Sequence, residues 1–388
     1  MPRLTGRVLR RAAAVAALAF AYAMDAGAGG PDTGVPAHPE ASRKDHRPVE
    51  QPMAQAYSAA ADPARERAAV EKTLRRLGDR WARFYTAAEF GGLEETLNGW
   101  YSGVGLWLEK TGKDVRIVGV QPGSPAERAG VRPGDVISAV DGIATRDLTV
   151  ATVAAALRGQ PATSVGLAVR RDGVPLRFAL VRAAMASHDV DASFTPDGVV
   201  VIRIAAFTRG VGREVREAVA GRPGHRGGVL LDLRANPGGL LDEAVETASV
   251  FLSGGTVVTF ERAGSPPERL LAGPDGDTTV PLVVLVDGGT ASAAEVVAGS
   301  LRDRDRAVIV GSRTFGKGSV QEPLRLADGS AIEVTVGRYR TPSGRNLDGS
   351  GIDPDVAVNA NRPPREAERR ALTVVRGLLA TLPTKDRG

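Results

Sequence analysis

One stretch decides the fold class: Gly228-Val-Leu-Leu-Asp-Leu-Arg-Ala-Asn-Pro-Gly-Gly239. It begins as a short apolar strand and ends in a glycine-rich turn. Three more strand-like runs, the last at 307–310, are likewise followed by helical or glycine-rich segments. Continuous apolar strands that alternate with helices indicate a sheet buried on both faces. The sequence therefore predicts an α/β domain over residues 185–362, followed by a terminal helix within residues 363–388.

The N-terminus has the features of an export signal. The first 28 residues carry four arginines, a small apolar stretch at 12–24, and Ala26-Gly27-Ala28, which fits a signal-peptidase site. We therefore expect a signal peptide at residues 1–28 and an exported, periplasmic or extracytoplasmic protein. The alternative is an uncleaved anchor with membrane association, although the apolar run is shorter than the ~20 residues of a membrane span. Residues 29–50 lack apolar periodicity and predict a disordered linker.

Composition excludes several classes of protein. Loss of residues 1–28 removes four arginines and Asp25 and lowers the formal net charge from +5 to +2, which gives no case for nucleic-acid binding. The absence of cysteine excludes disulfides, thiol nucleophiles and thiolate metal sites. The four histidines lack metal-ligand spacing. We expect neither a metal nor a cofactor.

Apolar residues after the linker recur at steps of three and four: Val70, Leu74, Leu77, Trp81 and Phe84. This spacing is typical of helices that bury one face. It predicts a helical N-terminal region over residues 51–100.

Residues 101–184 alternate between short apolar runs and turns, with two helix-like pieces among them, and predict a small, partly open β-barrel. Ser102-Gly-Val-Gly-Leu106 and Gly123-Ser-Pro-Ala-Glu-Arg-Ala-Gly130 resemble the carboxylate-binding loop and short helix of a PDZ domain. PDZ domains bind peptide C-termini by strand addition. The resemblance implies a peptide-binding loop formed by Gly103, Val104, Gly105 and Leu106. Taken alone, these glycines fit an ordinary strand-entry turn as well.

Ser292 is a candidate nucleophile. Asp287-Gly-Gly-Thr290 leads into Ala291-Ser292-Ala-Ala-Glu295, where a helix is predicted to begin. Free backbone N–H groups and the helix dipole favour a developing negative charge there. Ser292-x-x-Glu295 ahead of an apolar run fits a helix capping box equally well. From this segment alone both interpretations stay open.

Lys317 is the single lysine between Lys113 and Lys385. An ammonium can lose its proton when desolvated, whereas a guanidinium stays charged. Lys317 is therefore a candidate general base, the alternative being an ordinary surface lysine. Action near neutral pH needs its pKa to fall by about 3 units from ~10.4, which burial can impose. We expect Lys317 to be buried, near Ser292 and free of a carboxylate partner.

The turn Asn236-Pro-Gly-Gly239 offers backbone amides that can approach a substrate carbonyl closely. A phosphate-binding loop is the competing function, but the required Gly-x4-Gly-Lys-Ser/Thr pattern is absent. A Ser-His-Asp triad would need His225 with Asp232. His225 lies in a polar turn before the strand rather than after it, which disfavours that arrangement.

Four segments together resemble the C-terminal processing peptidases, also called tail-specific proteases. They are Asp232-Leu-Arg-Ala-Asn-Pro-Gly-Gly-Leu-Leu-Asp-Glu243, Val286-Asp-Gly-Gly-Thr-Ala-Ser-Ala-Ala-Glu295, Gly311-Ser-Arg-Thr-Phe-Gly-Lys-Gly-Ser-Val-Gln321 and Tyr339-Arg-Thr-Pro-Ser-Gly-Arg345. The resemblance covers about residues 70–360. It implies a multidomain α/β protein with a helical N-terminal segment, a PDZ domain and a crotonase-like serine protease core.

The resemblance also implies roles for individual residues. Ser292 would be the nucleophile, Lys317 the general base, and Gln321 would orient the lysine amine through a hydrogen bond. The oxyanion hole would be formed by the N–H of Ala293 and of Gly238 or Gly239. The implied protein is an exported, metal-free serine endopeptidase that cuts near the C-termini of proteins whose tails its PDZ domain binds. A catalytically silent PDZ scaffold is the alternative. A trypsin-like PDZ protease is disfavoured because Gly-Asn-Ser-Gly-Gly is absent.

The chain departs from the family pattern at two places. Ala294 stands where relatives often have a second serine, which leaves the nucleophile intact. Asp79-Arg-Trp-Ala82 stands where relatives commonly have Asp-Pro-x-Ser. The second difference affects N-terminal packing. In relatives this packing supports a homodimer, and whether this chain forms one stays open.

Overall fold

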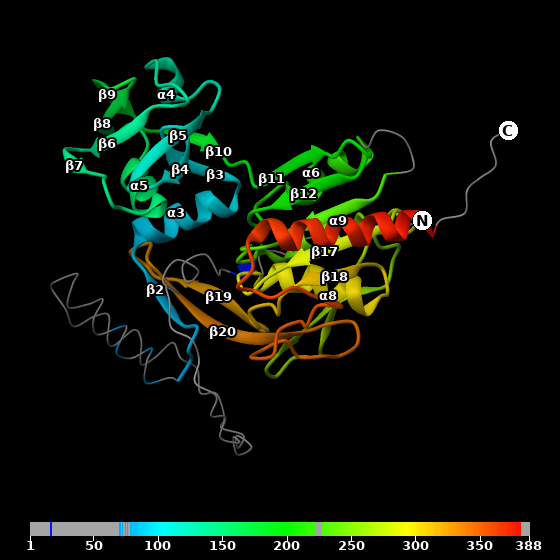
Figure 1. Ribbon diagram of the computed structural model, residues 1–388. Coiled ribbons are helices and arrows are strands. Elements are labelled where there is room, and N and C mark those ends of the chain that lie inside the picture. The colour runs from blue at the N-terminus through cyan, green and yellow to red at the C-terminus, as the bar shows by residue number, and fades with distance from the viewer. Residues whose placement is uncertain are drawn as a thin grey trace, which may run out of the picture. The chain divides into compact units, whose positions relative to one another are not determined.

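The computed structural model describes residues 16–17, 70, 72, 74, 76, 78–221 and 227–381, and Figure 1 shows its ribbon. Apart from Ala16 and Ala17, the predicted signal peptide and linker lie outside the described residues. The chain divides into two compact units, one formed by residues 1–90 with 189–388 and the other by 91–188. Among the helices that are described, none is both long and apolar enough to span a membrane.

A six-stranded sheet forms the centre of the larger unit. Its order is β11 (Val190–Phe194), β12 (Val200–Ile204), β13 (Val229–Asp232), β17 (Leu282–Val286), β18 (Val308–Gly311) and β21 (Val356–Ala357). The strands from β12 to β21 are parallel, and β11 pairs antiparallel at one edge. The predicted α/β fold is confirmed.

Both faces of this sheet are buried, as the continuous apolar strands predict. Leu231 points into a cluster with α6 (Val211–Ala220), α7 (Leu241–Ser249) and α8 (Ala293–Asp303). Its neighbour Leu230 points to the other face, toward α9 (Pro364–Ala380), the red helix of Figure 1. Full burial of such a side chain contributes about 1.5–3 kcal/mol. Successive residues of one strand therefore hold helices on opposite faces.

A second, antiparallel sheet contains β16 (Glu268–Leu271), β15 (Thr256–Arg262), β20 (Ala331–Arg340) and β19 (Ser319–Arg325), in that order. The short strand β2 (Arg83–Tyr85) pairs with β20. Two shorter strands, β1 (Ala16–Ala17) and β14 (Gly239–Leu240), pair antiparallel with each other.

The helical prediction for residues 51–100 is wrong at Phe84. Phe84 lies on β2, and the next helix, α3, spans Ala87–Leu97. Phe84 nevertheless packs with Val70, Leu74 and Ile332 in one buried cluster. The spacing of the apolar residues thus indicated burial correctly, but pairing with β20 makes the last of them part of a strand.

The smaller unit contains β3 (Trp100–Gly103), β4 (Leu106–Thr111), β5 (Asp114–Val120), α4 (Pro125–Arg128), β6 (Val136–Val140), β7 (Ile143–Ala144), α5 (Val150–Leu157), β8 (Ser164–Arg171), β9 (Val174–Val181) and β10 (Ala183–Ala186). Its main sheet has the order β4-β5-β6-β8-β9, with β7 paired to β6, while β3 pairs with β10. In the described part of the chain β4 is therefore an edge strand.

Candidate active site

Ser292 stands where β17 has ended and α8 begins. Its backbone has φ 54° and ψ −120°, a conformation that costs a residue other than glycine free energy. The side chain is fully buried, and among the described residues its Oγ has no hydrogen-bond partner. A strained, unpartnered hydroxyl at a helix N-terminus is free to react.

The turn after β13 reaches the same place. A Cβ built on Gly238 would lie 2.9 Å from Ser292 Cβ and 3.0 Å from the Ala293 nitrogen, and Gly238 has φ +105°. Gly239, at φ +138°, would place a Cβ 2.3 Å from the Phe207 carbonyl oxygen. Both positions therefore require glycine, and the turn lies directly against Ser292.

The predicted oxyanion donors differ in their present partners. The Gly238 N–H donates to Asn236 Oδ1 at 2.9 Å, so this donor is occupied. Ala293 is the first residue of α8, where an N–H has no intrahelical acceptor. Asn236 is itself fixed, because its Nδ2 donates to the Ile204 carbonyl at 2.9 Å. Between Gly238 and Ala293, it is therefore Ala293 whose N–H has no acceptor to give up.

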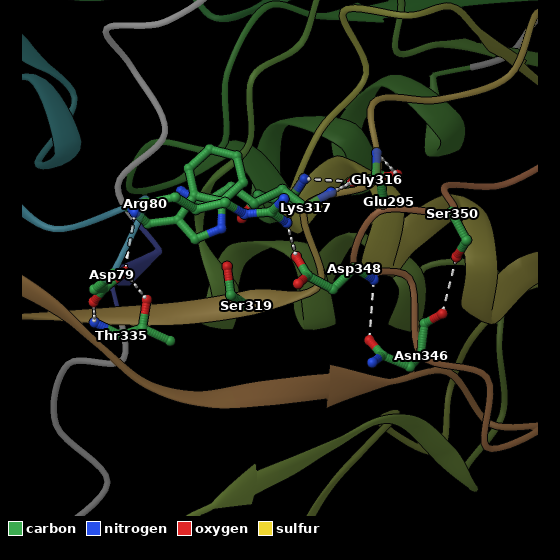
Figure 2. Close-up of polar contacts among 12 residues, drawn as sticks. Asp79, Arg80, Glu295, Gly316, Lys317, Ser319, Thr335, Asn346, Asp348 and Ser350 are labelled. Atoms are coloured by element: carbon green, nitrogen blue, oxygen red, sulfur yellow. Dashed lines mark hydrogen bonds and ion pairs between the residues drawn. The ribbon is translucent and has the colours of Figure 1, made fainter. Parts of the chain in front are cut away.

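Glu295 links the segments that carry Ser292 and Lys317. Its Oε2 accepts the backbone N–H of Ser292 at 3.0 Å and that of Lys317 at 2.8 Å. Its Oε1 accepts the N–H of Gly316 at 2.8 Å and the Thr314 hydroxyl at 2.5 Å; Figure 2 labels Glu295, Gly316 and Lys317. Because two N–H groups share one oxygen, the backbones of Ser292 and Lys317 are close together.

The same carboxylate decides between the two interpretations of the Ser292 segment. Glu295 accepts the Ser292 N–H as in a capping box, but its own N–H donates to the Ser292 carbonyl at 2.8 Å rather than to the hydroxyl. Capping therefore leaves Oγ available. Burial raises the pKa of Glu295, while its hydrogen bonds to Thr314 and the backbone act in the opposite direction.

Lys317 is buried, with 4% of its surface exposed. Burial lowers its pKa to about 8, assisted by Arg83 and opposed by Glu333, Asp79 and Asp348. The expectation that no carboxylate would act on this amine is therefore wrong, yet burial outweighs the three carboxylates. The Nζ lies 5.1 Å from the centroid of the Trp81 ring.

Gln321 lies on β19 and is fully buried. Its Nε2 donates to Ser319 Oγ at 2.9 Å and to Thr335 Oγ1 at 3.3 Å. Its Oε1 has no hydrogen-bond partner among the described residues, so the predicted bond to the Lys317 amine is not formed here. Gln321 thus keeps a buried acceptor that is unused among the described residues.

Comparison with known proteins identifies the family. Residues 198–358 match peptidase family S41, and residues 116–171 match the PDZ domain. The chain is 38% identical over 304 residues to the carboxyl-terminal-processing protease of Synechocystis sp., which covers 75% of this chain and 70% of that protein. The chain belongs to peptidase family S41. It is a serine-type peptidase of the C-terminal processing group, as its sequence motifs predicted.

Two further likenesses agree with this. The S41 peptidase is 35% identical over 324 residues to the chloroplastic C-terminal processing peptidase of Tetradesmus obliquus, over 77% of this chain and 69% of that one. A putative S41 protease from Bacteroides fragilis shares its fold, with a TM-score of 0.53, 16% identity, and coverage of 87% of this chain and all of that chain.

Asp232 has no place in a triad of this S41 peptidase. Arg234 donates to both of its oxygens, at 2.8 Å and 2.6 Å. His225 lies outside the described residues. Asp232 therefore orients Arg234 at the end of β13.

The PDZ loop of the S41 peptidase is fixed by its own backbone. The Val104 carbonyl accepts the Ala126 N–H, and the Gly105 carbonyl accepts the Gln121 N–H, both at 3.0 Å. A Cβ on Gly105 would lie 2.3 Å from Ser124 Cβ, and Gly105 has φ +79°. Gly103 ends β3 and Leu106 begins β4. The predicted loop is thus held at the start of the edge strand.

Sequence reasoning missed two residues of this S41 site. Glu295 was interpreted only as a cap, although an acid within the otherwise apolar start of a helix is a signal of internal hydrogen bonding. Trp81 was assigned to a helix face. Nothing in the local sequence places it near Lys317, which is 236 positions further along the chain.

Proposed function

We propose that this S41 peptidase is an exported endopeptidase that cuts near protein C-termini with a Ser292–Lys317 dyad, while its PDZ domain binds the substrate tail. The observation that carries the dyad is the shared Glu295 oxygen, which fixes the backbones of both residues at one point. The unpartnered Ser292 Oγ and the lowered pKa of Lys317 support the same assignment.

The proposed reaction has two stages. The neutral Lys317 amine takes the Ser292 proton as Oγ attacks the carbonyl carbon of the scissile amide. The oxyanion is stabilised by the Ala293 N–H and by the N–H of Gly239, or by that of Gly238 once it has left Asn236 Oδ1. The lysine ammonium then protonates the leaving amine, which yields an acyl-enzyme. Water then attacks the acyl carbon while the lysine again accepts a proton, and the lysine passes this proton to Ser292 Oγ as the acyl–oxygen bond breaks and the second product leaves.

Gln321 and Glu295 prepare the groups that react. In the ammonium form Lys317 gains a donor that Gln321 Oε1, buried and unpartnered among the described residues, can accept. Glu295 touches no reacting atom and acts through the backbone of both partners, so it is a positioning residue.

Tail binding by the PDZ unit is supported by the edge position of β4 and by the fixed loop from Gly103 to Leu106. An extended peptide adds to such an edge through main-chain hydrogen bonds, and loop N–H groups hold its carboxylate. The proposed substrates are therefore proteins with accessible C-terminal tails. Export rests on residues 1–28 and is tested by N-terminal sequencing of the protein recovered outside the cytoplasm.

The dyad is tested with Ser292→Ala, Lys317→Ala and Lys317→Arg on fluorescently labelled, unfolded casein. Each variant is expected to lose at least about 1,000-fold in kcat/KM, the arginine variant included, because a guanidinium cannot act as a neutral base. Ser300→Ala is the matched control: Ser300 is a buried serine of the same helix whose hydroxyl is bonded to the Val297 carbonyl.

The pH dependence gives an independent test. Since the base form is neutral and its pKa is about 8, kcat/KM should fall about tenfold per pH unit below that value and level off above it. A rate that is flat from pH 5 to 9, or an active Lys317→Arg enzyme, would contradict the dyad. A wild-type protein that binds tails but cuts nothing would instead be a scaffold.

A further inference from the structure

The segment from Asp79 to Tyr85, here called the N-terminal segment, lies over the base. The Trp81 ring centroid is 5.1 Å from Lys317 Nζ and 6.1 Å from the centroid of the Phe315 ring. Lys317 and Phe315 belong to the loop that leads into β19. The amine therefore has an aromatic surface next to it that comes from the opposite end of the chain.

Two pairs of contacts hold the N-terminal segment in place. Asp79 accepts the Thr335 N–H at 2.7 Å and the Thr335 hydroxyl at 2.9 Å. Arg80 forms an ion pair with Asp348 at 2.9 Å, and both pairs are drawn in Figure 2. The Trp81 N–H donates to Asp79 Oδ1 at 3.0 Å. The ring position is thus set by contacts on either side of it.

Charged groups face the Lys317 amine from every element around it. Glu333 on β20, Asp79 in the N-terminal segment and Asp348 in the 341–355 loop all favour the ammonium, whereas Arg83 on β2 disfavours it. The Arg80 Cζ atom lies 4.8 Å from the centroid of the Trp81 ring, the ring that also lies next to the Lys317 amine. Three carboxylates act to keep the proton on, so exclusion of water is the main factor that favours the neutral amine, and Arg83 adds to it.

We propose that Trp81 is a positioning residue that keeps water from the Lys317 amine and thereby increases the fraction of this base that is neutral near pH 7. The proposal rests on the proposed function of Lys317. Two effects of the ring oppose each other. Its apolar body excludes water, which disfavours the charge, while its π-face attracts a cation. The proposal states that exclusion of water is the larger effect.

The direction in which the acidic limb of the pH profile moves in Trp81 variants separates exclusion of water from attraction by the π-face. Trp81→Ala opens the amine to water while the three carboxylates remain, so the acidic limb of kcat/KM should move to higher pH by about one unit or more. Trp81→Leu removes the π-face but keeps an apolar cover, and its limb should stay within about 0.3 unit of the wild type. Phe194→Ala, which removes an exposed aromatic of β11, is the control and should leave the limb unchanged.

A direct titration makes the test independent of catalysis. The chain has six lysines, so the ¹³Cε signals of labelled lysine can be followed by NMR, and Lys317→Arg assigns the one in question. In a Ser292→Ala background, Trp81→Ala should raise the pKa of Lys317 by the same amount as the acidic limb moves. An unchanged or lowered pKa of Lys317 would overturn the proposal.

The same measurements separate a failure of the proposed role of Lys317 from a failure of the proposal on Trp81. If Lys317 is not the base, the wild-type acidic limb does not follow the NMR titration of Lys317, whatever Trp81 does to that titration. If Trp81→Ala does not fold, as judged by circular dichroism, Trp81→Gln keeps most of the bulk and brings a polar group to the amine. Trp81→Gln should also raise the pKa of Lys317, and an unchanged pKa in this variant overturns the proposal.

Discussion

The two sides of the proposed active site are built in different ways. The nucleophile side, formed by Ser292, Ala293 and the turn 236–239, comes from the ends of neighbouring strands in one parallel sheet. The base side, formed by Lys317, Gln321 and the N-terminal segment, needs Asp79 to meet Thr335 across 256 positions of sequence. The first side depends on backbone geometry and the second on the charges and apolar groups around one amine. Variants that attack either property test this difference.

Among variants outside the proposed dyad, the largest effect is expected on the nucleophile side, from Gly238→Ala. The added Cβ would lie 2.9 Å from Ser292 Cβ at a φ of +105°, so the turn must move away from the nucleophile. The clash also reaches the Ala293 nitrogen, 3.0 Å from the added Cβ, and misplacement of one oxyanion donor costs about 100–1,000-fold in kcat. We expect a loss in this range, measured with labelled casein at saturating substrate.

Gly198→Ala is the matched control for Gly238→Ala. Gly198 also has a positive φ, +84°, but an added Cβ there has nothing within 4 Å. It carries the backbone strain without the clash, so its kcat should stay within about twofold of the wild type. Equal losses in both variants would mean that strain, rather than the approach to Ser292, limits the enzyme.

The next effect concerns stability on the base side. The pKa of Lys317 is about 8 in the folded protein and ~10.4 when unfolded, so below pH 8 the folded state holds a charge that burial disfavours. This lowers the free energy of unfolding by about 3 kcal/mol at pH 7, and the cost shrinks as pH rises from 8 to 10.4. Lys317→Met should therefore raise the free energy of unfolding at pH 7 and have little effect above pH 10.5.

Urea unfolding followed by circular dichroism at pH 7 and pH 10.5 checks this. Lys113→Met serves as the control, because the Lys113 side chain is 70% exposed and should change little at either pH. A Lys317→Met protein that is less stable than the wild type at pH 7 would show that the buried ammonium is better compensated than its pKa indicates.

The smallest effect is expected where the N-terminal segment is attached. Asp79→Ala removes two hydrogen bonds to Thr335 and should lower the free energy of unfolding by about 1–2 kcal/mol. It also removes a carboxylate that favours the ammonium, so the electrostatic part of the change moves the acidic limb to lower pH.

Arg213→Ala is the control. It breaks an exposed helical ion pair with Glu217, and its free energy of unfolding should stay within about 0.5 kcal/mol of the wild type. Equal stabilities of the two variants would show that Asp79 does not anchor the segment.

The same contrast explains how much could be predicted from sequence. Ser292 and the 236–239 turn follow strands whose apolar runs are continuous, and the carboxyl ends of parallel strands meet at one edge of a sheet. Their nearness follows from local patterns alone. The PDZ elements were predictable for the same reason, since turn residues separate their short strands.

The base side was predictable only in part. Lys317 was identifiable by its isolation in the sequence, but the carboxylates around it were not, because Glu333 and Asp348 come close only through the pairing of β19, β20 and β2. Phe84 has helical spacing and lies in a strand, since pairing with β20 overrides the local pattern. Nothing in the sequence around Trp81 indicates that it lies next to Lys317.

The pairing of β2 with β20 also has a consequence for synthesis. Ribosomes make the N-terminal segment first, and Asp348, the partner of Arg80, follows 268 residues later. Until that part of the chain has emerged, the ion pair between Arg80 and Asp348, which helps to hold Trp81 beside Lys317, cannot form. The polar contacts that hold the N-terminal segment beside Lys317 can therefore be completed only after residue 348 has been made.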